Sequence, residues 1–245
     1  MSTQLTIRLR EKAILKANLL QLKETMRNLA AQTQLQSASA QGQLIDSWRY
    51  ERYRDPIAID LNNDGHVDLR PLSLSPEDGV SQPSFNWEND SDRETTAWIG
   101  PQDGFLAIDL AADGSAGSVG LINQSKELAF TLWPTEEQGS TNSDLEAVRL
   151  VFDTNNDGLL SGEDARWSEF HVWQDINQNG VSETGELSTL DQLGIKYINL
   201  IPTADGAQSF ADGSAITGTS YLEKVDDQTR LVGDVRLAYQ PLSPT

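Results

Sequence analysis

Oxygen-bearing side chains recur at the spacing of an EF-hand calcium loop in several parts of this chain. Such a loop has ligands at positions 1, 3, 5, 7, 9 and 12, of which position 7 offers a backbone carbonyl, and a glycine at position 6 for a sharp turn. Residues 175–186 satisfy all of these positions, including a glutamate at position 12 that binds the ion through both oxygens. The predicted ligands are Asp175, Asn177, Asn179, Val181, Glu183 and Glu186. This segment therefore predicts a Ca²⁺ (Ca2+) site.

Residues 153–164 follow the same pattern, but position 12 is aspartate. Because the aspartate side chain is shorter, it reaches the ion less easily with both oxygens, and we expect a weaker or more magnesium-tolerant site. The predicted ligands are Asp153, Asn155, Asp157, Leu159, Ser161 and Asp164. Helices expected at residues 142–151 and 163–170 would make this segment a complete helix-loop-helix unit.

Two further segments match the pattern in part. Residues 60–68 supply positions 1, 3, 5, 7 and 9, with a histidine carbonyl at position 7, but Pro71 stands where the acid belongs. Another ligand would have to come from elsewhere in the chain. Residues 109–115 keep only positions 1 and 5, so a metal site and a plain turn both remain open. The candidate ligands in these two segments are Asp60, Asn62, Asp64, His66, Asp68, Asp109 and Asp113.

The composition also favours cations as ligands. Aspartate and glutamate outnumber lysine and arginine by 37 to 18 among the 245 residues, for a formal net charge of −19. Repulsion from phosphates argues against nucleic acid or an anionic membrane as a partner. The chain has no cysteine, which excludes disulfides and thiolate zinc sites. Bound divalent cations would neutralise the acidic surface, and a surface that serves only solubility is the alternative.

The charge is distributed unevenly along the chain. Residues 1–55 contain nine basic and five acidic residues, whereas residues 56–245 contain nine basic and 32 acidic ones. Between residues 7 and 31, leucines and a methionine recur every three or four residues, which predicts an amphipathic helix that packs against the body or docks on a protein partner. We therefore divide the chain into an N-terminal helix and linker, residues 1–47, and an acidic module, residues 48–245.

The acidic module alternates short apolar runs with turn-forming residues. Strands are expected at residues 57–61, 97–100, 105–108, 170–174 and 195–201, and a hairpin over residues 216–239. Residues 142–151 and 188–193 are predicted to be helical, and residues 70–96 to form a loop. Together these elements predict an α+β fold that calcium organises, with EF-hand-like loops and short antiparallel strands. No run of about 18 apolar residues predicts a membrane span, and the N-terminus has no classical export signal.

Asp55–Pro56 is the single Asp-Pro bond of the chain. In one interpretation the proline simply begins a strand, since a residue before proline is held extended. In the other, the Asp55 carboxylate attacks its own main-chain carbonyl to form a five-membered anhydride, and the proline nitrogen leaves as a secondary amine once it is protonated. If a strand runs through the bond, Asp55 shares a face with Tyr53, Ile57 and Ile59. Burial on that face would raise the pKa of Asp55 toward a form that supplies the proton.

Five segments, in their order and spacing, resemble the calcium-triggered self-processing modules of repeat-in-toxin (RTX) proteins. They are residues 54–65, 98–109, 152–158, 172–180 and 193–200. The resemblance implies that calcium folds a disordered module, that the Asp-Pro bond at its front edge breaks, and that the new aspartate C-terminus can be joined to a lysine ε-amine as an isopeptide. Carried over, Asp55 would be the nucleophile and new C-terminus, and Pro56 the new N-terminus. The resemblance also implies a lysine-bearing acceptor protein and a secreted or cell-surface location.

Two other functions remain compatible with the sequence. A non-catalytic module that calcium folds would display the N-terminal helix to a protein partner and leave the chain whole. A calcium sensor that opens a groove for a partner helix is disfavoured, because such grooves are rich in methionine and this chain has only Met1 and Met26.

Overall fold

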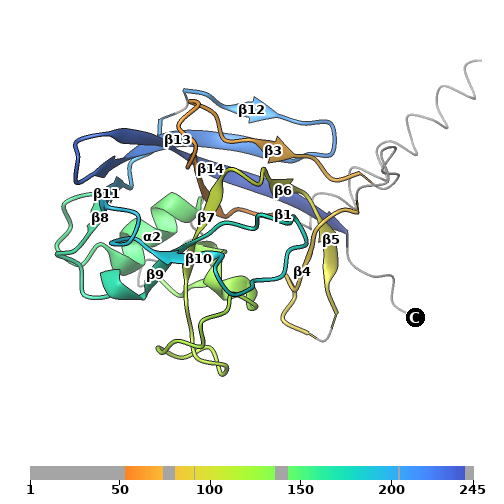
Figure 1. The fold of residues 1–245 in the computed structure, drawn as a ribbon, viewed down its shortest axis with the longest axis horizontal. Helices are drawn as coiled ribbons and strands as arrows, with labels where there is room; N and C mark the ends of the chain where they lie inside the picture. Colours follow the sequence, from red (N-terminus) through yellow and green to blue (C-terminus); the bar gives the residue numbers. More distant parts are fainter. Residues whose placement is uncertain (1–52, 74–80, 91, 136–142, 204, 241–245) are drawn as a thin grey trace, which may run out of the picture. The chain divides into compact units, whose positions relative to one another are not determined.

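The structure is a computed structural model that describes residues 53–73, 81–90, 92–135, 143–203 and 205–240 (Figure 1). These residues lie in one compact unit, Arg52–Thr245. The predicted N-terminal helix and linker, residues 1–47, fall outside the described residues. None of the helices in the described ranges is long and apolar enough to cross a bilayer.

A large antiparallel sheet organises the unit, with its main path in the order β10-β9-β7-β2-β14-β13-β11-β8. These strands are β2 (Ile57–Ile59), β7 (Gly104–Ile108), β8 (Leu159–Ser161), β9 (Phe170–Trp173), β10 (Leu187–Thr189), β11 (Ile195–Asn199), β13 (Ala215–Lys224) and β14 (Thr229–Gln240). Short strands join beside this path, namely β1 (Tyr53–Arg54), β4 (Ser84–Phe85), β5 (Glu94–Thr96) and β12 (Gln208–Ser209). A separate pair is formed by β3 (Leu69–Arg70) and β6 (Trp98–Ile99).

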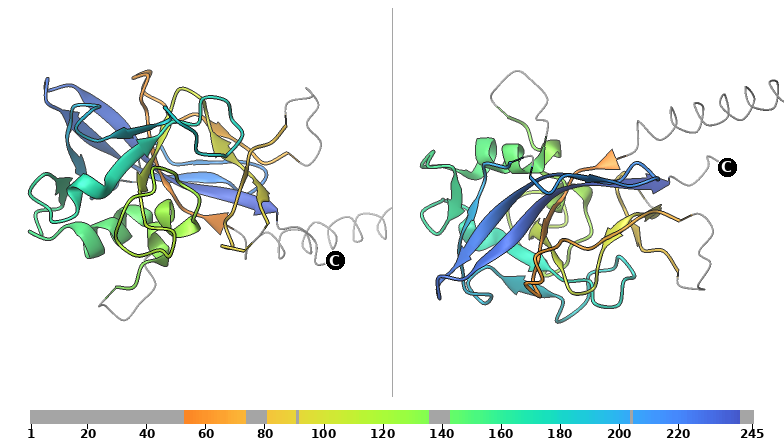
Figure 2. Two further views of the ribbon diagram at one scale, coloured as in Figure 1. Left: turned by 60° about the horizontal axis from the view of Figure 1, so that its bottom comes forward. Right: turned by 90° about the horizontal axis from the view of Figure 1, so that it is seen from above.

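The β13–β14 hairpin is the longest element of the sheet and extends across the unit (Figure 2). Its pairing is regular except for a register shift between Ile216 and Gly218. The hairpin predicted over residues 216–239 is therefore confirmed. Along its other edge, β14 pairs with β2, and nearer its end with β1 and β5. A single strand thus holds both segments that flank the Asp55–Pro56 bond.

Apolar side chains pack in two clusters, one for each face of the central strands. Ile57 and Ile59 of β2 belong to the cluster that includes α2 (Asp144–Phe152), whereas Ala58 belongs to the other. The second cluster is rich in aromatic rings, including Phe85, Trp87, Trp98, Phe105 and Trp173. Because successive strand residues point to opposite faces, residues of β14 alternate between the two clusters in the same way.

Helix α2 forms where the sequence predicts a helix over residues 142–151. The Ser143 hydroxyl caps it by accepting a hydrogen bond of 3.2 Å from the Glu146 N–H. Asp144 and Glu146 place negative charge in the first turn, where the helix dipole favours it. Leu145, Val148 and Phe152 face the core. This helix therefore supplies its N-terminal end, with Ser143 and Asp144, to the interior of the unit.

The predicted α+β class is wrong, because the described residues are mostly β-structure. They contain one α-helix and three short 3₁₀ segments, η1 (Ser125–Glu127), η2 (Phe130–Leu132) and η3 (Trp167–Glu169). Only η3 forms in residues 163–170, so residues 153–164 are not part of a helix-loop-helix unit. The helix expected over residues 188–193 is also wrong, since β10 extends to Thr189 and residues 190–194 form hydrogen-bonded turns. Segments of six to eight residues gain too few hydrogen bonds to offset the cost of helix nucleation, so these two segments form turns and a 3₁₀ segment beside the short strands. The predicted loop over residues 70–96 likewise contains β4 and β5.

Candidate functional site

The Asp55–Pro56 bond lies between β1 and β2, both of which pair with β14. Ile57 is opposite Asp234 in this ladder. The Val235 N–H donates a hydrogen bond of 3.0 Å to the Pro56 carbonyl oxygen. Hydrogen bonds to one strand therefore fix the main chain on both sides of the bond.

An arginine holds the carboxylate of Asp55. Arg236 Nε donates to Asp55 Oδ1 over 2.8 Å, and the two side chains keep 40% and 23% of their surface exposed. The guanidinium also lies over the Tyr53 ring, 5.8 Å from its centroid. The sequence predicts burial of Asp55 together with Ile57 and Ile59, and the two isoleucines are fully buried. Asp55 itself is only partly buried and is ion-paired.

A second carboxyl group, Asp234, lies on the same face and is 2% exposed. The Ser143 hydroxyl and the Asp144 N–H hydrogen-bond to its carboxylate, while Asp234 Oδ1 has no partner. Burial raises the pKa of Asp234 to about 7, and repulsion from Asp55 adds to the rise. The two hydrogen bonds and the charge of Arg236 oppose it. Asp234 is therefore a carboxyl group that holds a proton close to neutral pH.

A third carboxyl group, Asp144, is fully buried at the start of α2. Its two oxygens accept hydrogen bonds from the N–H groups of Phe130 and Thr131, at 2.6 and 2.7 Å. Burial, with repulsion from Asp234 and Asp55, raises the pKa of Asp144 well above its usual range. Sequence reasoning missed Asp144 and Asp234 as site residues. The signal for Asp234 was an acid at an inward position of an alternating, otherwise apolar strand.

The predicted calcium loop at residues 175–186 is closed by hydrogen bonds to its acids. Asp175 and Glu186 are 2% and 7% exposed. Asp175 accepts from the N–H groups of Asn179 and Gly180 at 3.2 and 2.7 Å, and Gly180 has a φ of +73°, as the sharp turn at position 6 requires. Glu186 accepts from the N–H groups of Ile176 and Glu183 at 3.2 and 3.1 Å. Hydrogen bonds within the segment connect Asp175, Asn177, Asn179, Val181, Glu183 and Glu186.

Residues 153–164 close in the same way, with the shorter acid at position 12. Asp164 accepts from the N–H groups of Thr154 and Ser161 at 2.7 and 2.9 Å and is 5% exposed. Asp153 accepts from the Gly158 N–H at 2.9 Å. The structure thus brings together Asp153, Asn155, Asp157, Leu159, Ser161 and Asp164. The segment contains β8, and η3 follows it in place of the expected helix.

The incomplete loop that begins at Asp60 receives an acid from another part of the chain. Asp103, in the turn before β7, is 1% exposed and accepts a hydrogen bond of 2.7 Å from the Asp68 N–H. Its Oδ1 has no partner. Burial, followed by repulsion from Asp68, Asp60 and Asp64, raises the pKa of Asp103 to about 6. Asp103 therefore supplies a carboxylate where Pro71 cannot.

Sequence reasoning missed Asp103 because the segment 101–104 has the composition of an ordinary turn, in which an aspartate is common. The available signal was positional. β7 pairs with β2, and Asp60 directly follows β2 while Asp103 directly precedes β7. Antiparallel pairing places the end of one strand beside the start of the other, so these two acids meet at one edge.

Residues 109–115 contain the two remaining candidate ligands, for which a metal site and a plain turn both stay predictions. Asp109 accepts hydrogen bonds from the hydroxyl of Ser118 and from the N–H groups of Val119 and Gly120, the latter two both at 2.9 Å. Asp113 instead bonds Ser115, with its N–H at 3.0 Å. The two acids thus have separate partners.

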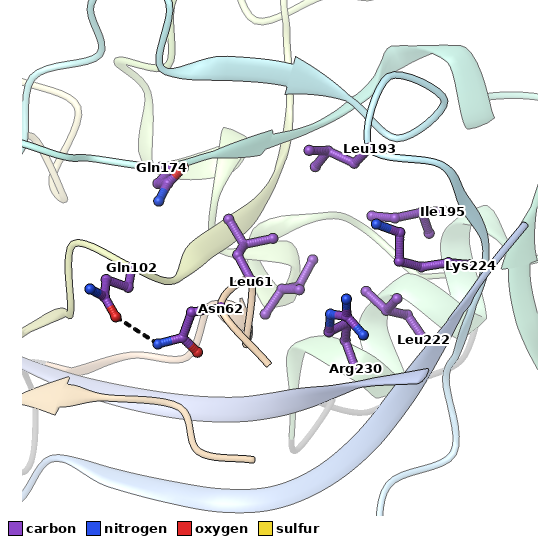
Figure 3. Close-up of a pocket in the computed structure, with 10 residues that line it drawn as sticks. Leu61, Asn62, Gln102, Gln174, Leu193, Ile195, Leu222, Lys224 and Arg230 are labelled. Atoms are coloured by element: carbon purple, nitrogen blue, oxygen red, sulfur yellow. Dashed lines mark hydrogen bonds between the residues drawn. The ribbon is translucent and has the colours of Figure 1, made fainter. Parts of the chain in front are cut away.

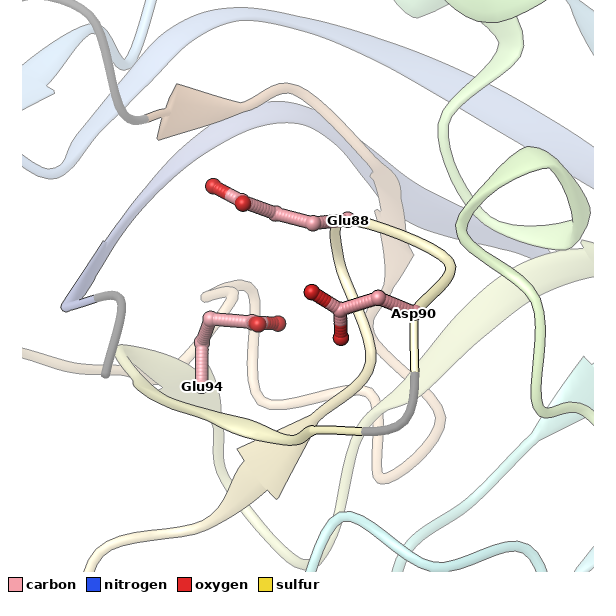
Figure 4. A group of neighbouring side chains, drawn as sticks. All are labelled: Glu88, Asp90 and Glu94. Carbon is pink, nitrogen blue, oxygen red and sulfur yellow. The ribbon is translucent and has the colours of Figure 1, made fainter. Parts of the chain in front are cut away.

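Three carboxylates that were not predicted as ligands converge where the connection after β4 meets the start of β5 (Figure 4). One oxygen each of Glu88, Asp90 and Glu94 lies within 4.8 Å of the others. Glu94 is buried and accepts a hydrogen bond of 2.7 Å from the Trp87 N–H, and burial raises its pKa. Glu88 and Asp90 are exposed, so this cluster could hold a cation at the surface.

A pocket of about 360 Å³ adjoins the Asp60 loop (Figure 3). Apolar side chains line part of it, and Lys224 and Arg230 lie on one side. Asn62 donates a hydrogen bond of 2.8 Å to the Gln102 side chain at its other side. The lining has no arrangement of nucleophile and base, so the pocket offers no catalytic chemistry of its own.

The residues of the three loops fit a hard divalent cation. Carboxylate, amide and main-chain carbonyl oxygens are the donors that Ca²⁺ prefers. The ion pairs Arg166–Glu169, Lys196–Glu223 and Arg236–Asp55 involve none of the predicted ligands. The buried Oδ1 of Asp103, which has no hydrogen-bond partner, is a further oxygen on a side chain that lies beside the Asp60 loop.

Comparison with known proteins identifies the family. The SPM domain model matches residues 57–238, so the match begins directly after the Asp55–Pro56 bond. This chain belongs to the SPM domain family. The chain is also similar to the iron-regulated protein FrpA of Neisseria meningitidis serogroup C, with 31% identity over 192 residues. That alignment covers 78% of this chain and 16% of FrpA, so the chain spans a small part of this relative.

Proposed function

We propose that this SPM domain binds Ca²⁺ and that the resulting fold promotes autocatalytic cleavage of its own Asp55–Pro56 bond. The observation that carries the proposal is the position of that bond. Its carboxylate is ion-paired with Arg236, and its flanking strands are held by β14. The reacting groups are therefore oriented only when the sheet has formed.

Calcium dependence follows from the burial of the loop acids. Asp60, Asp103, Asp153, Asp164, Asp175 and Glu186 are all at most 7% exposed. Bringing so many carboxylates together in a chain with a net charge of −19 is unfavourable unless cations neutralise them. When bound, Ca²⁺ would supply positive charge and coordinate these oxygens. Three segments would hold it, 60–68 with Asp103, 153–164 and 175–186.

The proposed reaction uses the side chain of Asp55. A carboxylate oxygen attacks the main-chain carbonyl carbon of Asp55, the bond from that carbon to the Pro56 nitrogen breaks, and the nitrogen takes up a proton. The products are a five-membered anhydride on residues 1–55 and a free proline N-terminus on residues 56–245. Water then opens the anhydride to a free carboxyl terminus. Alternatively, a lysine amine of an acceptor protein opens it and forms an isopeptide bond.

Calcium addition to the chelator-purified chain tests the proposal. Millimolar Ca²⁺ should convert the chain into fragments 1–55 and 56–245 on a gel, and Asp55→Ala should remain intact. Circular dichroism on the same samples follows folding. If Ca²⁺ induces structure while the native chain stays whole, cleavage is ruled out and the SPM domain is a calcium-folded interaction module.

A further inference from the structure

We infer that Asp234 is the general acid that protonates the Pro56 nitrogen as the Asp55–Pro56 bond breaks. This inference rests on the proposed function and names a residue for a step that the function requires. An amide nitrogen is a poor leaving group until it is protonated, so a proton donor must lie beside the bond. Asp55 cannot fill this role while its ionised carboxylate is the nucleophile.

The strand register places Asp234 beside the bond. The Val235 N–H donates to the Pro56 carbonyl oxygen at 3.0 Å, and Asp234 is opposite Ile57. Side chains at alternate positions of β14 share a face, so Asp234 and Arg236 lie on the face of Asp55. Arg236 binds the Asp55 carboxylate on one side of the bond, and Asp234 occupies the neighbouring position on the other side.

Hydrogen bonding distinguishes Asp234 from the other buried acid nearby. Both oxygens of Asp144 accept from main-chain N–H groups, those of Phe130 and Thr131. Asp234 Oδ1 is buried and has no partner, so it is the oxygen that can carry a proton and release it. Ser143 and the Asp144 N–H bond the carboxylate of Asp234 and fix its orientation.

The charged groups that face Asp234 come from three elements. Asp55 lies in the β1–β2 connection, Asp144 in α2 and Arg236 in β14 itself. From β13, the Thr217 hydroxyl donates to the Asp234 main-chain carbonyl at 2.9 Å. With burial, these surroundings raise the pKa of Asp234 to about 7, which is close to the optimum for a general acid at neutral pH.

The step is balanced without an external reagent. The Asp55 carboxylate forms a bond to its own carbonyl carbon, the carbon–nitrogen bond to Pro56 breaks, and the Asp234 proton passes to that nitrogen. Asp234 is left as a carboxylate, stabilised by Ser143 and the Asp144 N–H. It regains its proton from solvent, although one turnover needs only one proton.

Rates of calcium-induced cleavage as a function of pH test the inference. The native rate should fall about tenfold for each pH unit above about 7, as the acid loses its proton. Asp234→Asn should fold on addition of Ca²⁺ but cleave about 100-fold more slowly or worse. Glu127→Gln is the matched control, since it changes a buried carboxyl group of η1 whose pKa is also raised by burial, and its rate should equal the native rate.

Ser143→Ala provides a test that does not depend on the folding of Asp234→Asn. Loss of the hydroxyl removes a hydrogen bond that lowers the pKa of Asp234, so the decline in rate should move to higher pH. Asp234→Asn that folds and cleaves at the native rate, or a Ser143→Ala profile with no shift, would overturn the inference. Absence of cleavage in the native chain would instead overturn the proposed function.

Discussion

At the scale of single residues, three aspartates near one peptide bond have contrasting surroundings. Asp55 is partly exposed and paired with Arg236, whereas Asp144 and Asp234 are buried and have raised pKa values. Because their surroundings differ, one aspartate can be ionised and act as a nucleophile while another keeps its proton and acts as a general acid. Arg236 and Asp234 are the residues on which this separation depends.

Arg236→Ala should slow cleavage of the calcium-folded chain by about 10- to 100-fold. Without the 2.8 Å contact, the Asp55 carboxylate can rotate away from its own carbonyl, and small misplacements of reacting groups have effects of this size. Arg236→Lys should give an intermediate rate, since lysine keeps the charge but not the planar geometry. Single-turnover rates from gel densitometry measure both. Equal rates for the native chain and Arg236→Ala would show that the ion pair does not position Asp55.

Asp234 should also make stability depend on pH. Its folded-state pKa of about 7 is above the value of about 3.9 expected in the unfolded chain. The folded state therefore binds the proton more tightly, and its free energy of unfolding falls as pH rises from about 4 to 7. The loss is at most ~4 kcal/mol at pH 8.

Denaturant unfolding in excess Ca²⁺ at pH 5 and 8 measures this effect. The comparison is between the Asp55→Ala chain and the same chain with Asp234→Asn added, because Asp55→Ala prevents cleavage. Asp55→Ala also removes one negative charge near Asp234, so the rise in the pKa of Asp234 is somewhat smaller in this background. Asp234→Asn in this background should lose less stability between the two pH values than its parent. An identical loss in both would mean that Asp234 has an ordinary pKa.

At the scale of elements, local sequence predicted those parts whose partners are adjacent in the chain. The β13–β14 hairpin and α2 follow from alternation and from the Ser143 cap. The helices expected at residues 163–170 and 188–193 were wrong because segments this short do not offset the cost of helix nucleation, and they form turns and a 3₁₀ segment instead. Asp103 and Asp234 were missed because the segments that they meet are distant in the chain. Asp103 meets a segment 35 residues away, and Asp55 meets Arg236 across 181 residues.

The junction of the Asp60 loop with β7 gives a prediction at this scale. Asp103→Asn should weaken Ca²⁺ binding to this loop by about tenfold or more, because it removes a buried negative charge from the ligand cluster. Calorimetric titration of the Asp55→Ala chain measures the affinity of each class of site. Asp113→Asn, which changes an exposed acid outside the three proposed calcium segments, is the matched control and should bind like its parent. An unchanged titration with Asp103→Asn would remove Asp103 from the ligand set.

At the scale of the whole molecule, we propose that charge and topology connect calcium binding to cleavage of the Asp55–Pro56 bond. The net charge of −19 opposes compaction, and the three loops lie at the ends of strands in the large sheet. The same sheet contains β14, which pairs with the strands on both sides of Asp55–Pro56. We expect neutralisation of the loops to stabilise the sheet as a whole, and the sheet to orient the bond.

The most direct test compares folding and cleavage in one calcium titration. Circular dichroism of the Asp55→Ala chain gives the Ca²⁺ concentration at half-maximal folding, and intact-mass spectrometry of the native chain gives the rate of fragment formation at each concentration. We predict the same midpoint for both, with a new N-terminus at Pro56. Cleavage that proceeds equally in chelator, or an intact bond in the fully calcium-folded native chain, would contradict the account.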